Sequence, residues 1–344
     1  KMNQMKANIG GTLMKLKLFL GFAQCVSFFP ITFSTIPFSP SFRGLSNFLN
    51  LMSLDFFSVL AGTACEFITG FLRELEFSAV VLPIIMVATV ASYVVTMCTH
   101  SDKSKFTKES ATTRFFSLLF LVMYTLYTSV STKLFRLFKC REIQSQWYLT
   151  ADYNVVCAGE DYNAHVALAV IGICFCTLGI PIVIIFVLLR NRKYLHSSTC
   201  PEDELFKHVL VKKKYGSIYA DYTEDNYFFD LLDLGRRLLL TGALIMVGEQ
   251  SNTQVFLGAL LCQLWLLVVA MRRPYKAYWD NILSIVLSLQ LVLIMLCGTA
   301  LEMNRLTPAA SQDPFESASF DVLMVTFSVI IIITAVLAIV ITIP

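Results

Sequence analysis

Side chains that could carry catalysis or hold a metal ion are scarce in this chain of 344 residues. The chain has four histidines, and none is followed three or four residues later on a predicted helix by a second metal ligand. This pattern does not indicate a zinc or di-metal site. A Walker lysine loop and a GxSxG motif are both absent, which argues against nucleotide hydrolysis and α/β-hydrolase chemistry. We therefore expect no enzyme and no bound cofactor.

Charged residues are also few, at 15% of the chain, whereas 56% of the residues are hydrophobic and the mean hydropathy is +0.67. This composition leaves too little polar surface for a soluble domain. Eight apolar stretches are close to the roughly 20 residues that a membrane-spanning helix needs. They are 16–36, 77–98, 115–138, 166–189, 228–248, 253–271, 281–301 and 320–343. The sequence therefore predicts an all-α fold, a polytopic membrane helix bundle of about eight transmembrane helices without a cleavable signal peptide.

Lysine and arginine are unevenly divided among the loops, and loops rich in them stay in the cytoplasm. The inner segments on this topology are 1–17, 99–114, 190–227 and 272–280. They hold 18 of the 27 Lys and Arg residues, against 7 in the outer segments. This excess is the ordinary topogenic signal and does not indicate nucleic-acid binding. Thirteen of the 24 acidic residues lie outside, which favours either a rim that attracts cations or an ordinary solvated surface.

Most of the chain forms one predicted membrane domain, 16–344, after a short cytoplasmic lead-in at 1–15. The chain starts without an initiator Met and ends as its last apolar stretch finishes, so we expect a truncated piece of a longer polypeptide. Residues 37–76 are too polar to cross the membrane cleanly and too apolar for a free loop, so we expect an outer amphipathic or re-entrant segment there. An outer loop at 139–165 and an inner loop at 190–227 are the other large connections.

The ten cysteines show no metal-ligand spacing, and six of them lie in apolar stretches, where a thiol behaves as a small hydrophobic group. Cys140 and Cys157 differ because both fall in the predicted outer loop. A disulfide between them would form in an oxidising compartment and would fold the loop locally. Cys65, in the outer segment, is a competing partner.

The stretch 228–248 carries four charged side chains in its first half, Asp230, Asp233, Arg236 and Arg237. Asp233 and Arg237 have the i, i+4 spacing that favours an ion pair on a helix. Charges inside a membrane-spanning segment usually face the bundle interior or water. Two interpretations remain open. The charges form either an anchor at the inner leaflet, with locally paired arginines, or a polar joint between the inner loop and the pore helices that holds a gate.

Besides Pro30 in 16–36, prolines interrupt two further apolar stretches. Pro181 follows Gly179 near the middle of 166–189, and Pro83 lies in 77–98. Proline removes one backbone hydrogen bond and frees the carbonyl one turn earlier, so it bends a helix. Each proline marks either an ordinary bend of a membrane helix or a gating hinge.

Three consecutive lysines, Lys212, Lys213 and Lys214, end a predicted amphipathic helix at 202–214 in the inner loop. Basic side chains beside the cytoplasmic leaflet are attracted to anionic lipids. We therefore expect these lysines to contact lipid head groups.

Several long strings in the chain resemble a known family. They are WYLTADYNVVCAGEDYNAHVALAVIGICFCTLGIPIVIIFVLLRNRK, YGSIYADYTEDNYFFDLLDLGRRLLLTGALI and VVAMRRPYKAYWDNILSIVLSL, with KLKLFLGFAQCVSFFPITF and LNLMSLDFFSVL near the start. They look like the TRP-like (transient receptor potential-like) C-terminal membrane domain of algal, oomycete and other protist surface proteins, which is distantly similar to fungal TRP-like and flavin-carrier proteins. The resemblance covers roughly residues 10–305. It implies a cation-channel-like module, permeable to calcium, that follows a long extracellular region.

Three functions of different class stay open. The chain is a cation-channel-like membrane module of a larger surface protein, a transporter for a lipid or a small solute such as a flavin, or a non-conducting anchor for an extracellular assembly. The expected partners are membrane lipids, cations, other subunits of an oligomer or larger membrane assembly, and the extracellular region of the same or a partner chain; nucleic acid is not expected. We expect a multi-pass protein of the plasma or ciliary membrane.

Overall fold

The computed structural model of the chain describes residues 2–52, 70–99, 105–196, 198, 200–201, 204–247, 252–306 and 314–342. These residues form long helices and one small sheet, and the chain divides into two compact units. Unit 1 combines Lys1–Phe56 with Arg236–Pro344, and unit 2 is Phe57–Gly235. The all-α prediction is confirmed for the membrane helices, whereas the hydropathy pattern does not predict the sheet.

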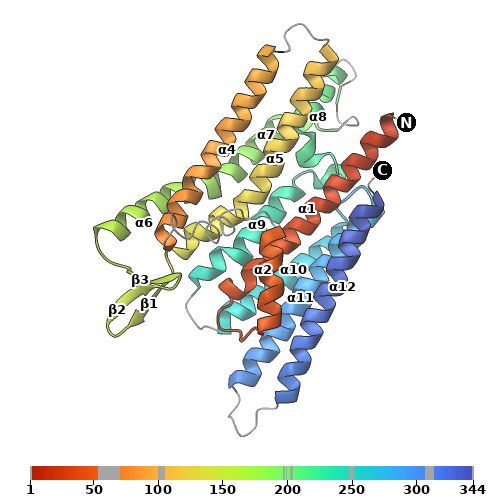
Figure 1. Ribbon diagram of the computed structural model, residues 1–344. Helices are drawn as coiled ribbons and strands as arrows, with labels where there is room; N and C mark the ends of the chain where they lie inside the picture. The colour runs from red at the N-terminus through yellow and green to blue at the C-terminus, as the bar shows by residue number, and fades with distance from the viewer. Residues whose placement is uncertain are drawn as a thin grey trace. The chain divides into compact units, whose positions relative to one another are not determined.

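Unit 1 is a bundle of apolar helices. It contains α1 (Met2–Thr32), α2 (Pro40–Met52), α10 (Asn252–Arg272), α11 (Tyr278–Leu306) and α12 (Pro314–Thr342), with the end of α9 (Phe229–Thr241) and the short 3-10 helix η5 (Ala243–Met246). The helix α1 packs on α2, α11 and α12, and α11 also packs on α10 (Figure 1). The core is rich in α1 phenylalanines, namely Phe19, Phe22 and Phe29. Since lipid is as apolar as these side chains, close packing rather than exclusion of water holds such helices together.

A proline inside α1 is compensated by a neighbouring helix. The ring nitrogen of Pro30 cannot donate to the carbonyl of Val26, four residues earlier. The hydroxyl of Ser46 in α2 lies 3.3 Å from the Val26 oxygen and 2.9 Å from the Ser27 oxygen, and its one proton is shared between these two acceptors. The helix α2, which lies in the predicted outer segment 37–76, therefore supplies the hydrogen bond that the proline removes.

Two glycines let α10 and α11 come close to the end of α1. A Cβ atom at Gly258 would lie 2.5 Å from the ring of Phe33, and one at Gly298 would lie 2.8 Å from the side chain of Ile36. Both neighbouring side chains are buried. A larger residue at either position would therefore force the packed side chains apart.

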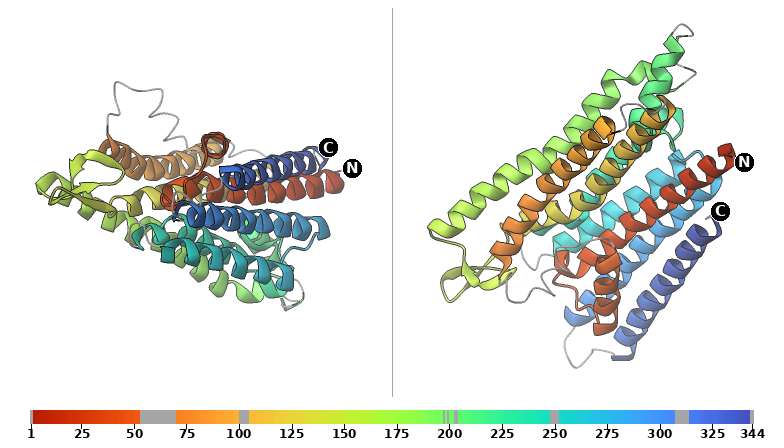
Figure 2. Two further views of the ribbon diagram at one scale, coloured as in Figure 1. Left: turned by 90° about the horizontal axis from the view of Figure 1, so that it is seen from below. Right: turned by 45° about the horizontal axis from the view of Figure 1, so that its top comes forward.

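Unit 2 contains α4 (Phe71–Thr99), α5 (Lys105–Arg136), α6 (Glu160–Gly172), α7 (Gly179–Arg190) and α8 (Leu205–Tyr219), with the first half of α9 and the short helices η1 (Ile173–Leu178), η2 (Arg192–Tyr194) and η4 (Glu224–Asn226). The helices α6, η1 and α7 follow one another directly. The helix α5 packs on α4, on α6 with η1, and on α8 (Figure 2). The strands β1 (Cys140–Ile143), β2 (Gln146–Leu149) and β3 (Asp152–Val156) form an antiparallel sheet between α5 and α6.

The buried face of α5 is polar over two turns. Its buried polar residues are Thr125, Thr128, Ser129, Ser131, Thr132 and Lys133. The Lys133 ammonium lies 2.8 Å from the carboxylate of Glu74 on α4, and this ion pair lets unit 2 bury a charge. A helix with such a face belongs inside a bundle, because lipid offers these groups no partner.

Within the described parts of the chain, five helical segments are long and apolar enough, by length and composition, to cross a membrane. They are Gly11–Thr32, Glu160–Arg190, Thr253–Arg272, Tyr278–Arg305 and Ala318–Val340. The predicted stretch 228–248 falls in α9, whose 13 residues reach about 20 Å at about 1.5 Å per residue, short of the ~30 Å hydrocarbon layer. The stretches 77–98 and 115–138 fall in α4 and α5, which are not among the five. A multi-pass protein is supported, but the count of eight spans is not confirmed.

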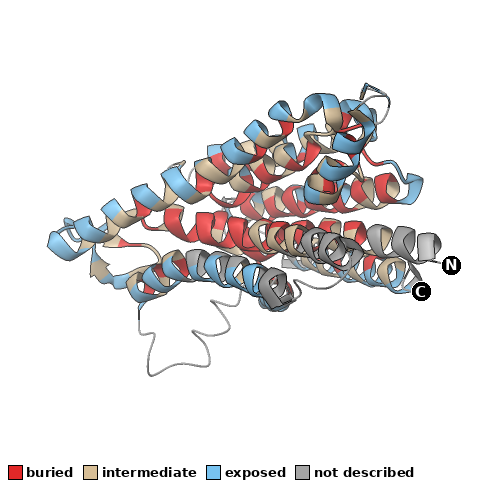
Figure 3. Ribbon diagram, turned by 90° about the horizontal axis from the view of Figure 1, so that it is seen from above, coloured by how far each residue is buried: buried red, intermediate tan, exposed pale blue. Residues whose placement is uncertain are grey.

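Two of the five segments differ sharply in burial. Buried residues make up 78% of the apolar stretch of α1 but only 11% of that of α6–η1–α7 (Figure 3). The first is therefore a core helix of its unit. The second presents most of its apolar surface outward, as a helix in contact with lipid does.

Candidate functional site

The acidic residues of α9 bond to tyrosines of unit 2. Asp230 is 1% exposed and accepts a hydrogen bond from the hydroxyl of Tyr222. The carboxylate of Asp233 accepts a hydrogen bond from the hydroxyl of Tyr124 on α5, over 2.9 Å. Both carboxylates therefore face protein groups, and each hydrogen bond offsets part of the cost of removing a charge from water.

The basic residues of α9 contact unit 1. Arg237 is 0% exposed, and its Nη1 donates to the side-chain oxygen of Gln24 on α1 at 2.7 Å. The guanidinium of Arg236 lies 4.8 Å from the ring centre of Trp265 on α10, within cation–π range. The ion pair between Asp233 and Arg237 stays a prediction, because the two residues belong to different units.

A second buried amide joins the end of α1 to its neighbours. The side-chain nitrogen of Gln254 on α10 donates at 2.8 Å to the carbonyl of Thr32 and at 2.8 Å to the carbonyl of Leu244. The hydroxyl of Thr241 donates to the carbonyl of Arg237 within α9. The side chains of Gln24, Gln254 and Thr241 thus bring amide and hydroxyl groups into this part of unit 1.

The predicted hinge in 166–189 contains a π-helical turn, η1, directly before Gly179. Pro181 cannot donate to the carbonyl of Thr177, and the hydroxyl of Tyr127 on α5 donates to that carbonyl at 2.9 Å. The Thr177 hydroxyl donates to the hydroxyl of Ser131, also on α5, at 3.0 Å. Single π turns are frequent at functional sites. The proline indicates in the sequence that the helix is disturbed here. Nothing in the sequence indicates that the disturbance takes the form of a π turn with i→i+5 hydrogen bonds.

The remaining sequence-predicted sites lie apart from this turn. Pro83 lies inside α4, and its role as a hinge stays a prediction. Lys212, Lys213 and Lys214 lie on α8, and the ammonium of Lys214 is 5.5 Å from the ring centre of Phe116 on α5. Their contact with lipid head groups also stays a prediction.

The predicted disulfide between Cys140 and Cys157 is present. It joins the first residue of β1 to the residue after β3 and so closes the three-stranded sheet. The hydroxyl of Tyr162 on α6 donates to the carbonyl of Leu137 at 3.0 Å, which ties the start of α6 to the end of α5. Cys65, the competing partner, lies outside the described residues.

Asp152 in β3 caps the N-terminus of α4. Its Oδ2 accepts a hydrogen bond of 3.1 Å from the backbone N–H of Phe71, the first residue of α4, and its Oδ1 accepts from the backbone and side chain of Asn154. The bond from Phe71 is the main cause that holds the pKa of Asp152 below its usual range. The preceding Gly70 has φ 103°, a conformation that favours glycine, so the chain can turn directly into the helix.

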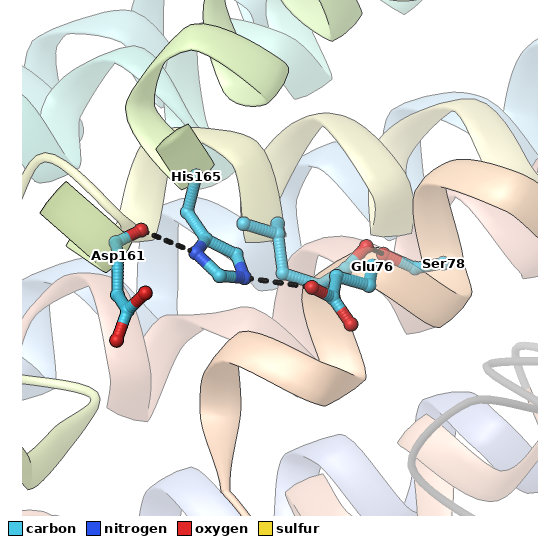
Figure 4. A network of polar contacts seen from close by, with 5 residues as sticks. Glu76, Ser78, Asp161 and His165 are labelled. Atoms are coloured by element: carbon cyan, nitrogen blue, oxygen red, sulfur yellow. Dashed lines mark hydrogen bonds and ion pairs between the residues drawn. The ribbon is translucent and has the colours of Figure 1, made fainter. Parts of the chain in front are cut away.

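The cap forms one wall of an open groove of about 790 Å³, which we call the hairpin groove. Its lining residues are Gly70, Leu72, Arg73, Glu76, Asp152, Asn154, Val155, Asp161 and His165. His165 on α6 contacts the Asp161 carbonyl through Nδ1 at 2.6 Å and the Glu76 carboxylate of α4 through Nε2 at 2.9 Å (Figure 4). Sequence reasoning missed this contact, because Glu76 and His165 are 89 positions apart.

The groove does not have the arrangement of a metal centre. Over the described ranges, no three or more His, Cys, Asp or Glu side chains converge as metal ligands would. Two of the carboxylates in the groove have other roles, because Asp152 caps α4 and Glu76 contacts the imidazole of His165.

Comparison with known proteins connects this helical architecture to a family. The family described as "Transient receptor potential (TRP) ion channel" matches residues 67–343. The chain belongs to the TRP ion channel family. Among its relatives, the cysteine repeat modular protein A of Toxoplasma gondii is 22% identical over 167 residues, which are 45% of this chain and 5% of that protein. No solved structure matches the chain significantly.

Membership of the TRP family confirms the resemblance found in the sequence and supports a cation-channel-like membrane module. The family is one of ion channels, not of enzymes. The π turn, the tyrosine-bonded aspartates and the hairpin groove all belong to the part of this TRP chain that the family covers.

Proposed function

We propose that this chain is the membrane module of a larger surface protein and that it conducts cations, calcium among them. The observation that carries the proposal is the family match, which extends over most of the chain and all of unit 2 after residue 66. The polar buried face of α5 also supports it, since polar groups at membrane depth usually face a bundle interior or water.

Two elements of the described residues have the properties of gating parts. At the π turn before Gly179 and Pro181, Tyr127 donates to the Thr177 carbonyl and the Thr177 hydroxyl donates to Ser131, so side chains of α5 hold a turn that lacks the regular backbone bond. The charged helix α9 would act as the polar joint, because its aspartates bond to tyrosines whose hydroxyls could release them. Pro83 would bend α4 in the same way as Pro181.

The proposal also covers the surroundings of the module. Lys212, Lys213 and Lys214 would bind anionic head groups at the inner leaflet. The Toxoplasma relative is far longer than the aligned part, which supports a large extracellular region on the same or a partner chain. We propose that several copies assemble in the plasma or ciliary membrane, since a single module would seldom enclose a complete pore.

Electrical recording from the purified protein in liposomes tests this function. We expect discrete currents that persist with calcium as the only cation, and none in liposomes without protein. Uptake of a flavin or lipid that saturates, without currents, would instead indicate a transporter. A correctly folded protein with neither activity would indicate a non-conducting anchor.

The role of α9 is tested by Asp233→Asn, with Glu204→Gln as the control. Glu204, the residue before α8, forms an ion pair with Lys207 in the first turn of α8, and neither residue belongs to α9. A gating joint requires that Asp233→Asn changes channel opening at normal folded yield, while Glu204→Gln leaves opening unchanged. If channel opening is unchanged in both variants, α9 is not a gating joint, and the interpretation as an inner-leaflet anchor remains.

A further inference from the structure

The hairpin groove contains an imidazole whose two nitrogens both face acceptors. Nδ1 of His165 lies 2.6 Å from the carbonyl oxygen of Asp161, and Nε2 lies 2.9 Å from Oε1 of Glu76. A carbonyl and a carboxylate can only accept. A neutral imidazole has one N–H and satisfies one of them, whereas an imidazolium has two and satisfies both. The geometry therefore corresponds to charged His165.

We propose that His165 and Glu76 form an acid-closed latch between α6 and α4. Histidine changes its charge between about pH 5 and pH 8. In mild acid the imidazolium donates to both acceptors and holds the two helices together. As the pH rises and the imidazole loses a proton, one contact becomes two lone pairs facing each other, and the latch opens.

Both side chains of the latch reach solvent, and other charged groups line the same groove. The side chain of His165 is 16% exposed and that of Glu76 is 53% exposed, so both exchange protons with solvent. The other charged groups that line the groove are Arg73 of α4, Asp152 of β3 and Asp161 of α6. Asp152 is engaged by the start of α4, as described above. Deeper in unit 2, Glu74 of α4 is paired with Lys133 of α5.

The latch is placed where it can affect the helix beyond it. His165 lies in the second turn of α6, and α6 leads directly into the π turn of η1. Holding α6 to α4 restricts the segment that ends at this turn. On the topology predicted from the loop charges, the groove faces the outside, so the latch would respond to external pH.

Hydrogen exchange in the intact, membrane-reconstituted protein at about pH 6 and about pH 8 tests the latch, after correction for the intrinsic exchange rate. We expect the amides of 71–80 and 160–168 to be about two- to fivefold better protected at pH 6, the range of a partly exposed ion pair. His165→Gln keeps a donor but does not titrate, so its protection in these segments should not change with pH. Equal wild-type protection at both pH values would refute the proposal.

A second variant keeps the test decisive if His165→Gln folds poorly. In Glu76→Gln the amide can turn its oxygen to a charged imidazole or its nitrogen to a neutral one, so the contact persists and loses its pH dependence. The control is Glu142→Gln, an exposed residue of β1 outside the groove lining, which should keep the wild-type pH dependence. If the Gln variants at 76 and 165 both retain the full wild-type difference, another group causes it and the latch is wrong. None of these outcomes depends on whether the protein conducts ions.

Discussion

Pro30 in α1 of unit 1 and Pro181 in α6–η1–α7 of unit 2 both interrupt an apolar helix, but the structure around the two prolines differs. In α1, Pro30 frees the carbonyl of Val26, which Ser46 of the adjacent α2 binds, and the helix stays α-helical to Thr32. In α6–η1–α7, Pro181 frees the carbonyl of Thr177, which Tyr127 binds, and the helix contains a π turn. The same backbone defect thus gives a regular buried helix in one unit and a deformed, exposed one in the other.

The difference lies in what surrounds each proline. The side chains of Phe33 and Ile36, just after α1, pack closely against Gly258 of α10 and Gly298 of α11. This close packing leaves no space for the end of α1 to bend. The π turn touches α5 on one side and is otherwise largely exposed. Packing therefore leaves room for movement at Pro181 and none at Pro30, and the hinge at Pro181 stays a prediction. Hydropathy alone leaves both interpretations open there, because it does not report packing.

The largest expected effect is removal of the disulfide of unit 2. Cys140→Ser should destabilise the sheet by about 3 kcal/mol, because the bond closes a loop of 17 residues. The measurement is protease resistance of the 140–157 region in the folded protein. Cys200→Ser, which removes a free thiol of the same unit, is the control. Unchanged resistance in Cys140→Ser would show that the loop is held by packing, as unit 1 is.

The second prediction concerns the close packing in unit 1. Gly258→Ala should cost about 1–3 kcal/mol, because the new Cβ would meet the buried ring of Phe33 at 2.5 Å. Gly179→Ala in the π-turn helix should cost less, since its Cβ would meet the carbonyl oxygen of Cys174 at 3.3 Å. Thermal unfolding in detergent compares the two. Equal losses would contradict the view that α1 is the more confined helix.

The positions of the most apolar helices and the disulfide could be predicted from the sequence. Long apolar runs place α1, α10, α11 and α12, because helix formation in lipid needs only internal hydrogen bonds. The pairing of Cys140 with Cys157 followed from their position in one loop. The helix α5 is harder to predict as a buried helix. Its hydroxyl side chains and Lys133 lower its hydropathy, although contacts with other helices bury them.

Contacts between distant parts of the chain could not be predicted. The bond from Tyr127 to Thr177, the cap of Asp152 on Phe71 and the contact of His165 with Glu76 each join residues at least 50 positions apart. A single sequence carries periodicity and local spacing but no record of which loops meet. The helix α9 is a further example. Its charged residues could be read from the sequence, but its length of only 13 residues could not be predicted.

The third prediction tests whether the two prolines use the same compensation. Tyr127→Phe and Ser46→Ala should each cost about 1–3 kcal/mol, since each leaves a buried carbonyl unpaired. Restoring a backbone N–H with Pro181→Ala or Pro30→Ala should reduce the corresponding loss by about 1 kcal/mol in a double-mutant cycle. We further expect Pro181→Ala, but not Pro30→Ala, to slow hydrogen exchange around its site. Additive effects in both cycles would mean that the hydroxyls and the prolines act independently.

The smallest expected effect is the acid sensitivity of the α4 cap in unit 2, where a carboxylate binds the backbone; at the end of α1 in unit 1 an uncharged amide binds it instead. The pKa of Asp152 is lowered because Phe71 donates to its carboxylate, so the capping contribution is complete above the ordinary aspartate range and is lost as the pH falls through the lowered value. Exchange protection of 71–74 should therefore stay constant down to about pH 4 and fall below it. The amides at the end of α1, where Gln254 holds the chain, should show no such step. Asp152→Asn should remove the step from α4 while lowering its protection at every pH, because a neutral amide oxygen is a weaker acceptor for a helix N-terminus than a carboxylate.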